Sequence, residues 1–188
     1  MMQFAFRRAS GRCSIIPASR NTRYSKEILI TMNAESVSNF LRDNNIHGEV
    51  VRLDHQTPTV EAAAQVMGVP VDCIIKSVLL LADSVPVLAI ANGTTRIDTK
   101  RVADYLGIAR KRVKLADAET VLELTGFRVG GVPPLGHKTR LRTLVEDRVL
   151  AQPEVYGGGG AVDALLRIAP VEIVRVAGAE IVSLAGTD

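Results

Sequence analysis

The chain of 188 residues is poor in the residue types that hold disulfide scaffolds and metal centres together, with two cysteines, three histidines and no tryptophan. Cys13 and Cys73 are sixty positions apart and form no motif, which argues against a disulfide-stapled scaffold. His47, His55 and His137 show no metal-ligand spacing with each other or with the cysteines. We therefore expect neither a zinc site nor any other metal.

Long hydrophobic runs are also missing, although 47% of the residues are hydrophobic. No apolar run reaches the ~18 residues that a membrane-spanning helix needs. We expect a soluble protein with one good core and a single main domain. The motifs G-x-x-x-x-G-K-[ST], G-x-G-x-x-G, G-x-S-x-G and H-E-x-x-H are absent. The run Gly157–Gly160 has no lysine after it, so it is not a P-loop, and it predicts a flexible loop near a cleft.

Acidic side chains are almost absent from residues 1–31, which carry five arginines and one lysine against Glu27, a net charge of +5. The whole chain has a net charge of +3, so residues 32–188 carry +3 − 5 = −2. This distribution does not support a broad basic face for nucleic acid, and any contact with a polyanion must be local. Residues 110–114 and 137–142 are the basic clusters for such a contact, and each also fits a solvated charged face.

The arginine- and serine-rich composition of residues 1–31 is typical of an organellar transit peptide. A disordered tail and a start codon assigned upstream of the true one fit the composition as well. Met32 opens a segment that has the pattern of a domain start with a capped helix. We favour the upstream start codon and a cytoplasmic protein, with a basic leader over residues 1–31 and a domain over residues 32–188.

A single charged residue, Lys76, interrupts the strand-forming run Ile74–Ala82. The run is apolar on both alternating faces, which is typical of a buried strand. A buried ammonium costs several kcal/mol unless it has a partner or reaches water. Lys76 is therefore either a lysine near a strand end that extends into solvent, or a cation held at the floor of a cleft for an anionic or carbonyl group.

Glycine and proline are concentrated between Thr125 and His137, where four glycines and two consecutive prolines lie within eleven residues. Proline fixes φ and lacks an N–H group, whereas glycine frees the backbone and removes the side chain. The segment is either a rigid connector between two elements or a loop whose bare peptide groups approach a ligand closely.

From Met32 onward, helical and strand-like patterns alternate. The patterns predict helices over 37–44, 59–67, 99–106, 117–124 and 170–176, and strands over 49–53, 74–82, 85–91, 141–145, 155–156, 165–169 and 181–184. Strands 74–82 and 85–91 are joined at Asp83 and Ser84, most simply as an antiparallel hairpin. We predict a mixed α/β (α+β) domain with a mixed, largely antiparallel sheet surrounded by helices.

Seven short segments share their order and spacing with a known family. They are Thr59–Ala63, Gly68–Pro70, Ile74–Val78, Asp98–Lys100, Leu115–Asp117, Thr125–Phe127 and Gly130–His137. A lysine in a strand followed by a Gly-x-x-x-Pro loop in this order resembles the YbaK/EbsC family, the free-standing relatives of the editing domain inserted in bacterial prolyl-tRNA synthetases. The resemblance covers about residues 34–184, and it implies the fold of that editing domain.

The resemblance implies hydrolysis, in trans, of the ester between a wrong amino acid and the 3′ adenosine of a tRNA, often the tRNA for proline. A second hydrolytic site is needed because synthetases discriminate poorly between small near-isosteres. Lys76 matches the cleft lysine that holds the acceptor end or its phosphate, and Gly130 and Gly131 match the loop that holds the scissile carbonyl or the terminal ribose. These three are the candidate catalytic residues. Water, oriented by the loop and by the substrate's own hydroxyl, attacks without a cofactor.

The candidate substrate-binding residues surround these three. They are His55, Thr57, Val132, Pro133, Pro134, Gly136, His137, Glu146, Gly158 and Gly159. Some positions depart from the family pattern: Pro133 stands where members commonly carry serine, and Glu146 stands where aspartate is usual. These departures put the rate and the amino acid in question more than the fold.

Two alternatives to the deacylase stay open. One is a non-catalytic module of the same fold that binds tRNA, a nucleotide or a synthetase, and the other is an unrelated small-molecule enzyme that uses the same cleft. The expected partners of the deacylase are the acceptor end of an aminoacyl-tRNA and an aminoacyl-tRNA synthetase, with no membrane, in a monomer or a weak homodimer. Lys76→Ala separates an enzyme from a binding module, because only an enzyme loses turnover while the fold stays intact.

Overall fold

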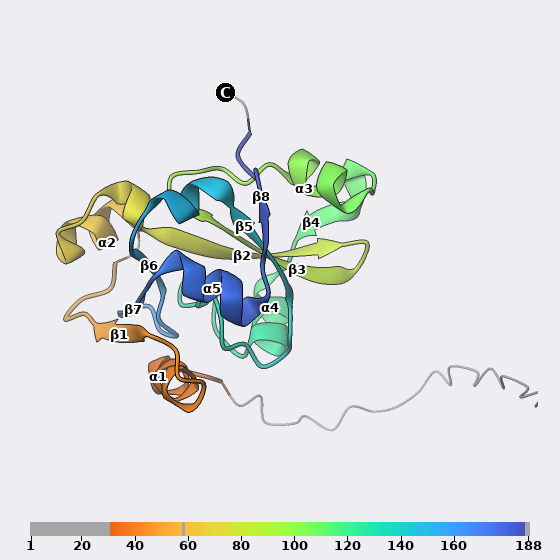
Figure 1. Cartoon of the computed structure of the whole chain (residues 1–188). Helices are drawn as coiled ribbons and strands as arrows, with labels where there is room; N and C mark the ends of the chain where they lie inside the picture. Colours follow the sequence, from red (N-terminus) through yellow and green to blue (C-terminus); the bar gives the residue numbers. More distant parts are fainter. Residues whose placement is uncertain (1–30, 58, 187–188) are drawn as a thin grey trace, which may run out of the picture.

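The computed structural model describes residues 31–57 and 59–186, so the predictions made for residues 1–30 lie outside the described residues. The predicted mixed α+β fold is confirmed (Figure 1). Its helices are α1 (Ala34–Asp43), α2 (Val60–Met67), α3 (Thr99–Leu106), α4 (Ala118–Thr125) and α5 (Pro170–Ala177). Its strands are β1 (Gly48–Arg52), β2 (Ile75–Ala82), β3 (Val85–Asn92), β4 (Val113–Leu115), β5 (Arg142–Glu146), β6 (Val155–Gly158), β7 (Ala164–Ile168) and β8 (Glu180–Val182). Short 3₁₀ helices cover Val71–Cys73, Arg110–Arg112 and Asp147–Ala151.

The strands form two sheets rather than the one that we expected. The larger sheet has the order β4-β2-β3-β5-β8, and the smaller has the order β1-β7-β6. In the larger sheet β2 is antiparallel to β3 and β4, whereas the β3–β5 and β5–β8 pairs are parallel. The smaller sheet is antiparallel throughout. A single parallel bridge between Ile74 and Tyr156 brings the start of β2 beside β6, where the two sheets meet.

Local capping explains where the helix α2 begins and ends. The hydroxyl of Thr59 accepts a hydrogen bond from the backbone N–H of Ala62, and Gly68 closes the helix in the left-handed conformation at φ 66°. The prediction for this helix is therefore confirmed at both ends. In α3 the capping residue is Asp98, immediately before the start of the helix predicted over 99–106, because the carboxylate of Asp98 accepts a hydrogen bond from the N–H of Lys100.

The predicted hairpin of β2 and β3 is confirmed, with Lys76 opposite Ala91 and Ala82 opposite Val85. Asp83 and Ser84 form its two-residue turn with φ values of 58° and 67°. Positive φ at both central residues is the geometry of a tight turn that matches strand twist. The turn fixes the register that places Lys76 near the far end of the hairpin.

The core lies on both faces of the larger sheet. On one face Leu88 and Ile90 of β3 pack with Leu166 of β7 and with Phe127, all of them without exposed surface. The other face carries a second cluster in which β3 and β5 pack against α3. Each large side chain that is fully buried contributes about 1.5–3 kcal/mol, so these clusters hold the two sheets and the helices together.

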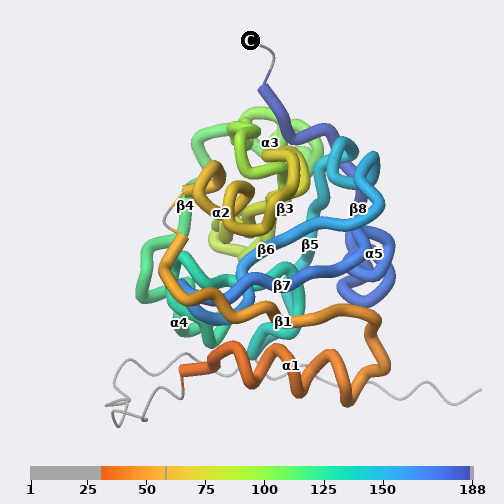
Figure 2. Tube along the Cα trace, turned by 90° about the vertical axis from the view of Figure 1, so that its left-hand side faces the viewer, coloured from red at the N-terminus to blue at the C-terminus, as the bar shows by residue number. Residues whose placement is uncertain are grey.

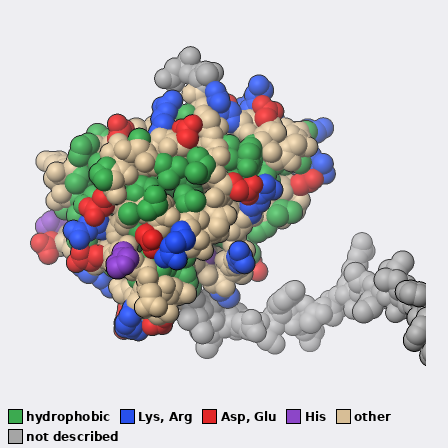
Figure 3. Space-filling view, in the orientation of Figure 1, with side chains coloured by type: hydrophobic (Ala, Val, Ile, Leu, Met, Phe, Trp, Pro, Cys, Tyr) green, Lys and Arg blue, Asp and Glu red, His purple; other side chains and the backbone are tan. Residues whose placement is uncertain are grey.

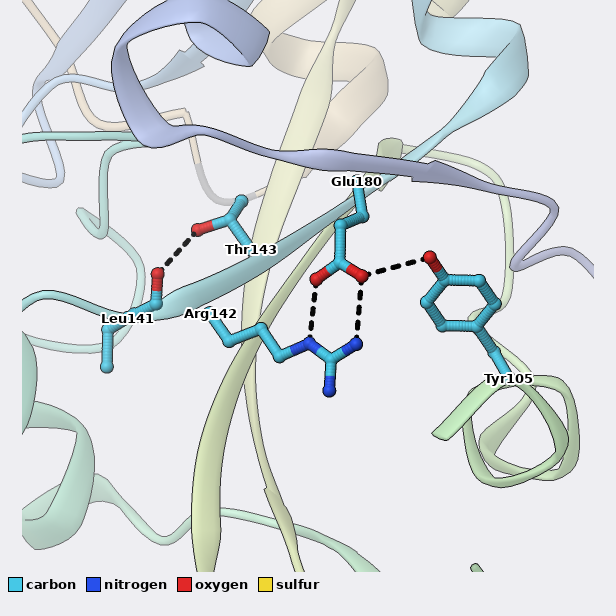
Figure 4. Close-up of polar contacts among 5 residues, drawn as sticks. All are labelled: Tyr105, Leu141, Arg142, Thr143 and Glu180. Atoms are coloured by element: carbon cyan, nitrogen blue, oxygen red, sulfur yellow. Dashed lines mark hydrogen bonds and ion pairs between the residues drawn. The ribbon is translucent and has the colours of Figure 1, made fainter. Parts of the chain in front are cut away.

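A polar contact ties the edge strand β8 to its neighbours (Figure 4). The carboxylate of Glu180 accepts two hydrogen bonds from the guanidinium of Arg142, at 2.7 and 2.8 Å, and one from the hydroxyl of Tyr105 at 3.0 Å. The Arg142 guanidinium lowers the pKa of the Glu180 carboxyl. Because β8 shares only a short register with β5, this contact helps to fix the start of β8.

The run of glycines differs from the flexible loop that we predicted. Gly157 and Gly158 belong to β6 and pair with Leu166 and Leu165 of β7. Glycine is needed there because other backbone segments lie directly against the strand. The short strand β4 was not predicted, since three residues that include the exposed Lys114 carry too weak a pattern.

Candidate functional site

A cleft of about 250 Å³ opens where α2, the start of β2, the Gly/Pro loop and the glycine run meet. Figure 2 faces the side of the molecule that carries α2, β6, β7 and β1. The lining residues are Thr57, Thr59, Val60, Ala63, Ile74, Ile75, Lys76, Ser77, Gly130, Val132, Gly157, Gly158, Val162, Ala164 and Leu165. Most of the side chains in this wall are small and apolar, and the polar groups come from few positions.

Lys76 is half-buried at the wall of this cleft. Its ammonium donates a hydrogen bond to the carbonyl oxygen of Gly93 at 2.8 Å. Burial lowers the pKa of Lys76 from its ordinary value of 10.5. An ammonium has three donors, and the described residues offer only this one acceptor within hydrogen-bond distance. The remaining N–H groups are available to a ligand in the cleft.

Ser77 is the polar cleft residue that sequence reasoning missed. Its hydroxyl oxygen is buried, and no partner within the described part of the chain bonds to it. A buried hydroxyl without a partner is costly, so it marks a place where a ligand or water completes the hydrogen bond. The strand pattern placed Ser77 on the face opposite Lys76. Both residues nevertheless line the cleft, which extends around the end of β2.

Two glycine-containing segments interlock behind the cleft. The N–H of Gly160 donates to the carbonyl of Gly131 at 2.8 Å. A Cβ atom on Gly131 would lie 2.9 Å from the backbone nitrogen of Ala161, and one on Gly158 would lie 2.3 Å from the carbonyl oxygen of Val132. These contacts are possible only without side chains, because real Cβ atoms do not approach backbone so closely. The Gly/Pro loop is therefore positioned by the glycine run.

The N–H groups of the loop do not all face the cleft as we expected. The N–H of Gly131 donates to the carbonyl of Arg128 at 3.1 Å, so it is already satisfied. Gly130, at φ 94°, and Val132 both line the cleft, and neither N–H has a partner among residues 31–57 and 59–186. The backbone donors that remain for a ligand are therefore those of Gly130 and Val132.

Five of the predicted site residues line the cleft together: Thr57, Lys76, Gly130, Val132 and Gly158. The others lie elsewhere. His55 is exposed and does not line the cleft. Pro133 and Pro134 are buried behind the loop, and the N–H of Gly159 bonds the carbonyl of Ala164 at 2.9 Å.

Gly136 and His137 line a different hollow, together with Phe40 and Val176. The Nε2 atom of His137 lies 2.8 Å from the carbonyl oxygen of Pro133, and its ring meets the Phe127 ring edge-on with centroids 6.4 Å apart. Burial lowers the pKa of His137. His137 therefore braces the Gly/Pro loop from behind rather than facing the cleft.

Glu146 has no exposed surface and is not part of the cleft wall. One of its carboxylate oxygens accepts hydrogen bonds from the backbone N–H groups of Leu184 and Ala185, the latter at 2.8 Å. Burial raises the pKa of Glu146. Glu146 therefore has a structural role: it fixes the segment after β8. It is not part of the proposed site.

The described residues hold no group of three or more His, Cys, Asp and Glu side chains that could bind a metal ion. They also hold no helix that is both long enough and apolar enough to cross a bilayer. What the cleft offers to chemistry is the Lys76 ammonium, the hydroxyl-bearing residues Thr57, Thr59 and Ser77, and the backbone N–H groups of Gly130 and Val132.

The fold and the site together define a class of protein. Its members are small α+β domains with a cleft built from a strand lysine and a glycine-rich loop. The family model for the aminoacyl-tRNA editing domain matches residues 54–176, more than half of the chain. The chain belongs to this family, which confirms the resemblance stated from the sequence.

Relatives and solved structures agree with this assignment. The proline–tRNA ligase of Lactobacillus gasseri is 28% identical over 133 residues, which are 69% of this chain and 23% of the ligase. The chain thus spans about a quarter of the length of that ligase. The Bacillus subtilis protein YwhH, of uncharacterized function, is 26% identical over 76% of this chain and 89% of its own. A crystal structure described as a candidate trans-editing enzyme for prolyl-tRNA synthetase has a TM-score of 0.77 and 34% identity, covering 82% of this chain and 97% of its own.

Proposed function

We propose that this protein is a trans-acting aminoacyl-tRNA deacylase that hydrolyses the ester of a mischarged tRNA, with tRNA for proline carrying a small wrong amino acid as its substrate. The observation that carries the proposal is that Lys76 lines one cleft together with Gly130 and Val132, whose N–H groups have no partner within the described residues. Membership of the editing-domain family and the likeness to a candidate trans-editing enzyme support it.

The reaction needs little from side chains, because an aminoacyl ester is already activated. Water attacks the carbonyl carbon, the bond to the 3′ oxygen breaks, and a proton from the water passes to that oxygen. The N–H groups of Gly130 and Val132 are the donors that we assign to the developing oxyanion. One such donor contributes about 10²–10³ in rate in acyl-transfer enzymes. Fixed positions for these donors avoid reorganisation during the reaction.

Lys76 holds the acceptor end in this proposal. Its ammonium has donors left after the bond to Gly93. The adjacent Ser77 lines the same cleft, and its buried hydroxyl has no partner within the described residues. The apolar wall formed by Val60, Ala63 and Val162 accepts a short aliphatic side chain. We propose that this small apolar wall, in a cleft of about 250 Å³, selects a small amino acid.

The proposed setting is the cytoplasm, where the deacylase would act on aminoacyl-tRNA after its release from a synthetase. We propose that it works as a monomer or weak homodimer. A second site of this kind is useful because a synthetase pocket rejects a smaller or isosteric amino acid by only about 1–3 kcal/mol.

The test is the deacylation of tRNA for proline charged with alanine, cysteine or serine, measured with the full-length chain. We expect rapid release of at least one of these amino acids and a loss of at least about tenfold in kcat/KM for Lys76→Ala, or ~1.4 kcal/mol of transition-state stabilisation. Lys76→Arg keeps the charge and should retain more activity than Lys76→Ala. Lys100→Ala is the matched control, because Lys100 lies exposed on α3 and its ammonium pairs with Asp104 at 3.9 Å.

Either of two results would count against the deacylase. Release rates equal to the uncatalysed reaction for all three tRNAs, with a folded protein, would favour a binding module of the same fold. Equal rates for wild type and Lys76→Ala would remove Lys76 from the mechanism.

A further inference from the structure

A second cavity, larger than the cleft, lies next to it at the end of β3. Its volume is about 600 Å³, and it is lined by residues 94–99, by Arg110 and Arg148, and by Ala185 and Gly186. The wall is mainly polar. None of the residues discussed for the cleft contributes to it, so the proposed deacylation chemistry leaves this cavity without a role.

Three arginines give this cavity its character: Arg96, Arg110 and Arg148. All three are exposed. Arg148 approaches the buried Glu146 only at 3.9 Å, and for Arg96 and Arg110 no ion pair is found within residues 31–57 and 59–186. Figure 3 shows several basic side chains along the upper edge of the molecule, with acidic side chains between them. The carboxylate that shares the wall, Asp98, is engaged at 2.8 Å with the N–H of Lys100.

Arginine-lined cavities suit phosphate. The guanidinium is planar, always charged, and binds phosphate oxygens through paired hydrogen bonds. The three arginines and Asp98 leave a local excess of positive charge, on a domain whose residues 32–188 carry a net charge of −2. A positive site on an otherwise acidic body directs a polyanion to this position rather than to the surface at large.

The cavity and the cleft share one short segment of chain. Gly93 accepts the hydrogen bond of the Lys76 ammonium and packs against Val60 of the cleft, because a Cβ atom at Gly93 would lie 2.5 Å from the Val60 side chain. The next residue, Thr94, already lines the arginine cavity. A strand whose last nucleotide occupies the cleft therefore has the arginine cavity beside it, since consecutive residues of the chain, Gly93 and Thr94, connect the two.

The wall of the cavity is held in place by the fold. Ile97 and Ala185 form an antiparallel bridge, and the N–H of Asp98 donates to the carbonyl of Leu184 at 2.9 Å. The buried Glu146 carboxylate binds the N–H groups of Leu184 and Ala185. A wall fixed from three sides keeps the cavity open without a ligand, which reduces the ordering cost of binding.

We propose that the cavity of Arg96, Arg110 and Arg148 binds backbone phosphates of the tRNA acceptor strand close to the terminal adenosine in the cleft. The choice of RNA as the source of the phosphate rests on the proposed function. The cavity supplies affinity and orientation through phosphates, and the cleft reads the aminoacyl group. Phosphate contacts of this kind position a nucleic acid without reading its sequence.

The test compares full-length wild type with the double variant Arg96→Gln/Arg110→Gln on two substrates. One is mischarged tRNA, and the other is the same amino acid esterified to adenosine, which carries no phosphate. For tRNA we expect the double variant to raise KM by about tenfold or more, and for the adenosine ester to change neither kcat nor KM. Arg42→Gln/Arg175→Gln is the control with the same loss of charge, because these exposed arginines lie on α1 and α5, away from both cavities.

Direct binding separates this proposal from the deacylase proposal. We would measure the affinity of uncharged, short, single-stranded RNA ending in CCA over a range of salt. Loss of two phosphate contacts should reduce the slope of log K against log salt by about 1.4, at 0.7 per contact for a single strand. This measurement needs no turnover, so it gives an answer even if no mischarged tRNA is hydrolysed.

Two results would overturn the inference. The first is an affinity and a salt slope for the RNA that are the same in wild type and in Arg96→Gln/Arg110→Gln. The second is equal binding of adenosine monophosphate and of the RNA, both weakened by the double variant, which would make the cavity a mononucleotide site. Because all three arginines are exposed, the glutamine variants are expected to fold, and circular dichroism of each variant checks this.

Discussion

A single added methyl group in the glycine run should impair catalysis through the loop on the other side of the cleft. In Gly158→Ala the new Cβ atom would lie 2.3 Å from the carbonyl oxygen of Val132 and 2.9 Å from the carbonyl carbon of Gly131. Both atoms are backbone, so no flexible side chain can turn away to relieve the contact. The Gly/Pro loop, β6 or both must move.

The size of the movement follows from the distances. Contacts under 3.0 Å are essentially never seen for real Cβ atoms, and 3.4 Å is the lower limit of ordinary contact. The separation from the Val132 oxygen must therefore increase by 3.4 − 2.3 = 1.1 Å to become ordinary. Misplacement of a catalytic group by about 1 Å costs on the order of 10²-fold in rate. Overpacking of this kind also destabilises a fold by about 1–3 kcal/mol.

The assay is steady-state deacylation of mischarged tRNA, combined with thermal unfolding of each variant. Gly158→Ala should lower kcat by about 10²-fold with a smaller change in KM, because the oxyanion donors act mainly in the transition state. The matched control is Gly107→Ala. Gly107 has φ 69° and no atom within 4 Å of its added Cβ, so this variant loses stability through backbone strain alone.

A clear result would refute this reasoning. If Gly158→Ala keeps the kcat of wild type while it lowers the melting temperature as Gly107→Ala does, the close packing of the two glycine segments serves stability only. The assignment of the oxyanion donors to Gly130 and Val132 would then lose its main support.

Three further predictions follow from the described contacts. Because burial lowers the pKa of Lys76, its ammonium loses its proton below the ordinary value of 10.5. In wild type, the rate enhancement over the uncatalysed reaction should therefore decline as pH rises towards that value. A pH–rate profile of both proteins should show that the decline begins at higher pH in Lys76→Arg. Burial raises the folded-state pKa of Glu146 above its ordinary value of 4.5. Wild type should therefore lose stability relative to Glu146→Gln as pH rises from 4.5 through the folded-state pKa. A difference in unfolding free energy, measured in urea, that is the same at every pH would contradict this. Arg142→Ala removes the partner of Glu180 at a half-exposed site. We therefore expect the free energy of unfolding to fall by at most about 1 kcal/mol and Tm to fall by about 2–4 °C, measured by calorimetry. A larger drop in Tm would mean that β8 depends on this contact more than its exposure indicates.

Local signals in the sequence were sufficient for most helices, for the β2–β3 hairpin and for the location of the Gly/Pro loop. Thr59 and Gly68 delimit α2 through bonds within a few residues, and such bonds depend little on the rest of the chain. Lys76 stood out because a charge within an apolar strand conflicts with burial. These predictions rest on interactions between close neighbours in sequence.

The features that sequence reasoning missed depend on contacts between distant segments. Ser77 lines the cleft, which forms where the start of β2 lies beside β6. The flexible loop predicted for the glycine run became partly a strand because Gly157 and Gly158 pair with β7. His137 and Glu146 were placed at the site from their positions in the motifs, whereas their side chains turn to Pro133 and to the chain after β8. No local pattern encodes these directions.

The packing of glycine on backbone connects the fold to the proposed chemistry. Backbone N–H groups are weak catalysts unless their positions are fixed, because a mobile loop must be ordered in each transition state. Here the carbonyl of Gly131 is bound by the N–H of Gly160, and the Val132 carbonyl rests on Gly158. The loop therefore cannot shift without β6 shifting as well. An active site that uses peptide groups in place of a reactive side chain needs this second segment, and the two glycine clusters of the sequence are best understood as one structural unit.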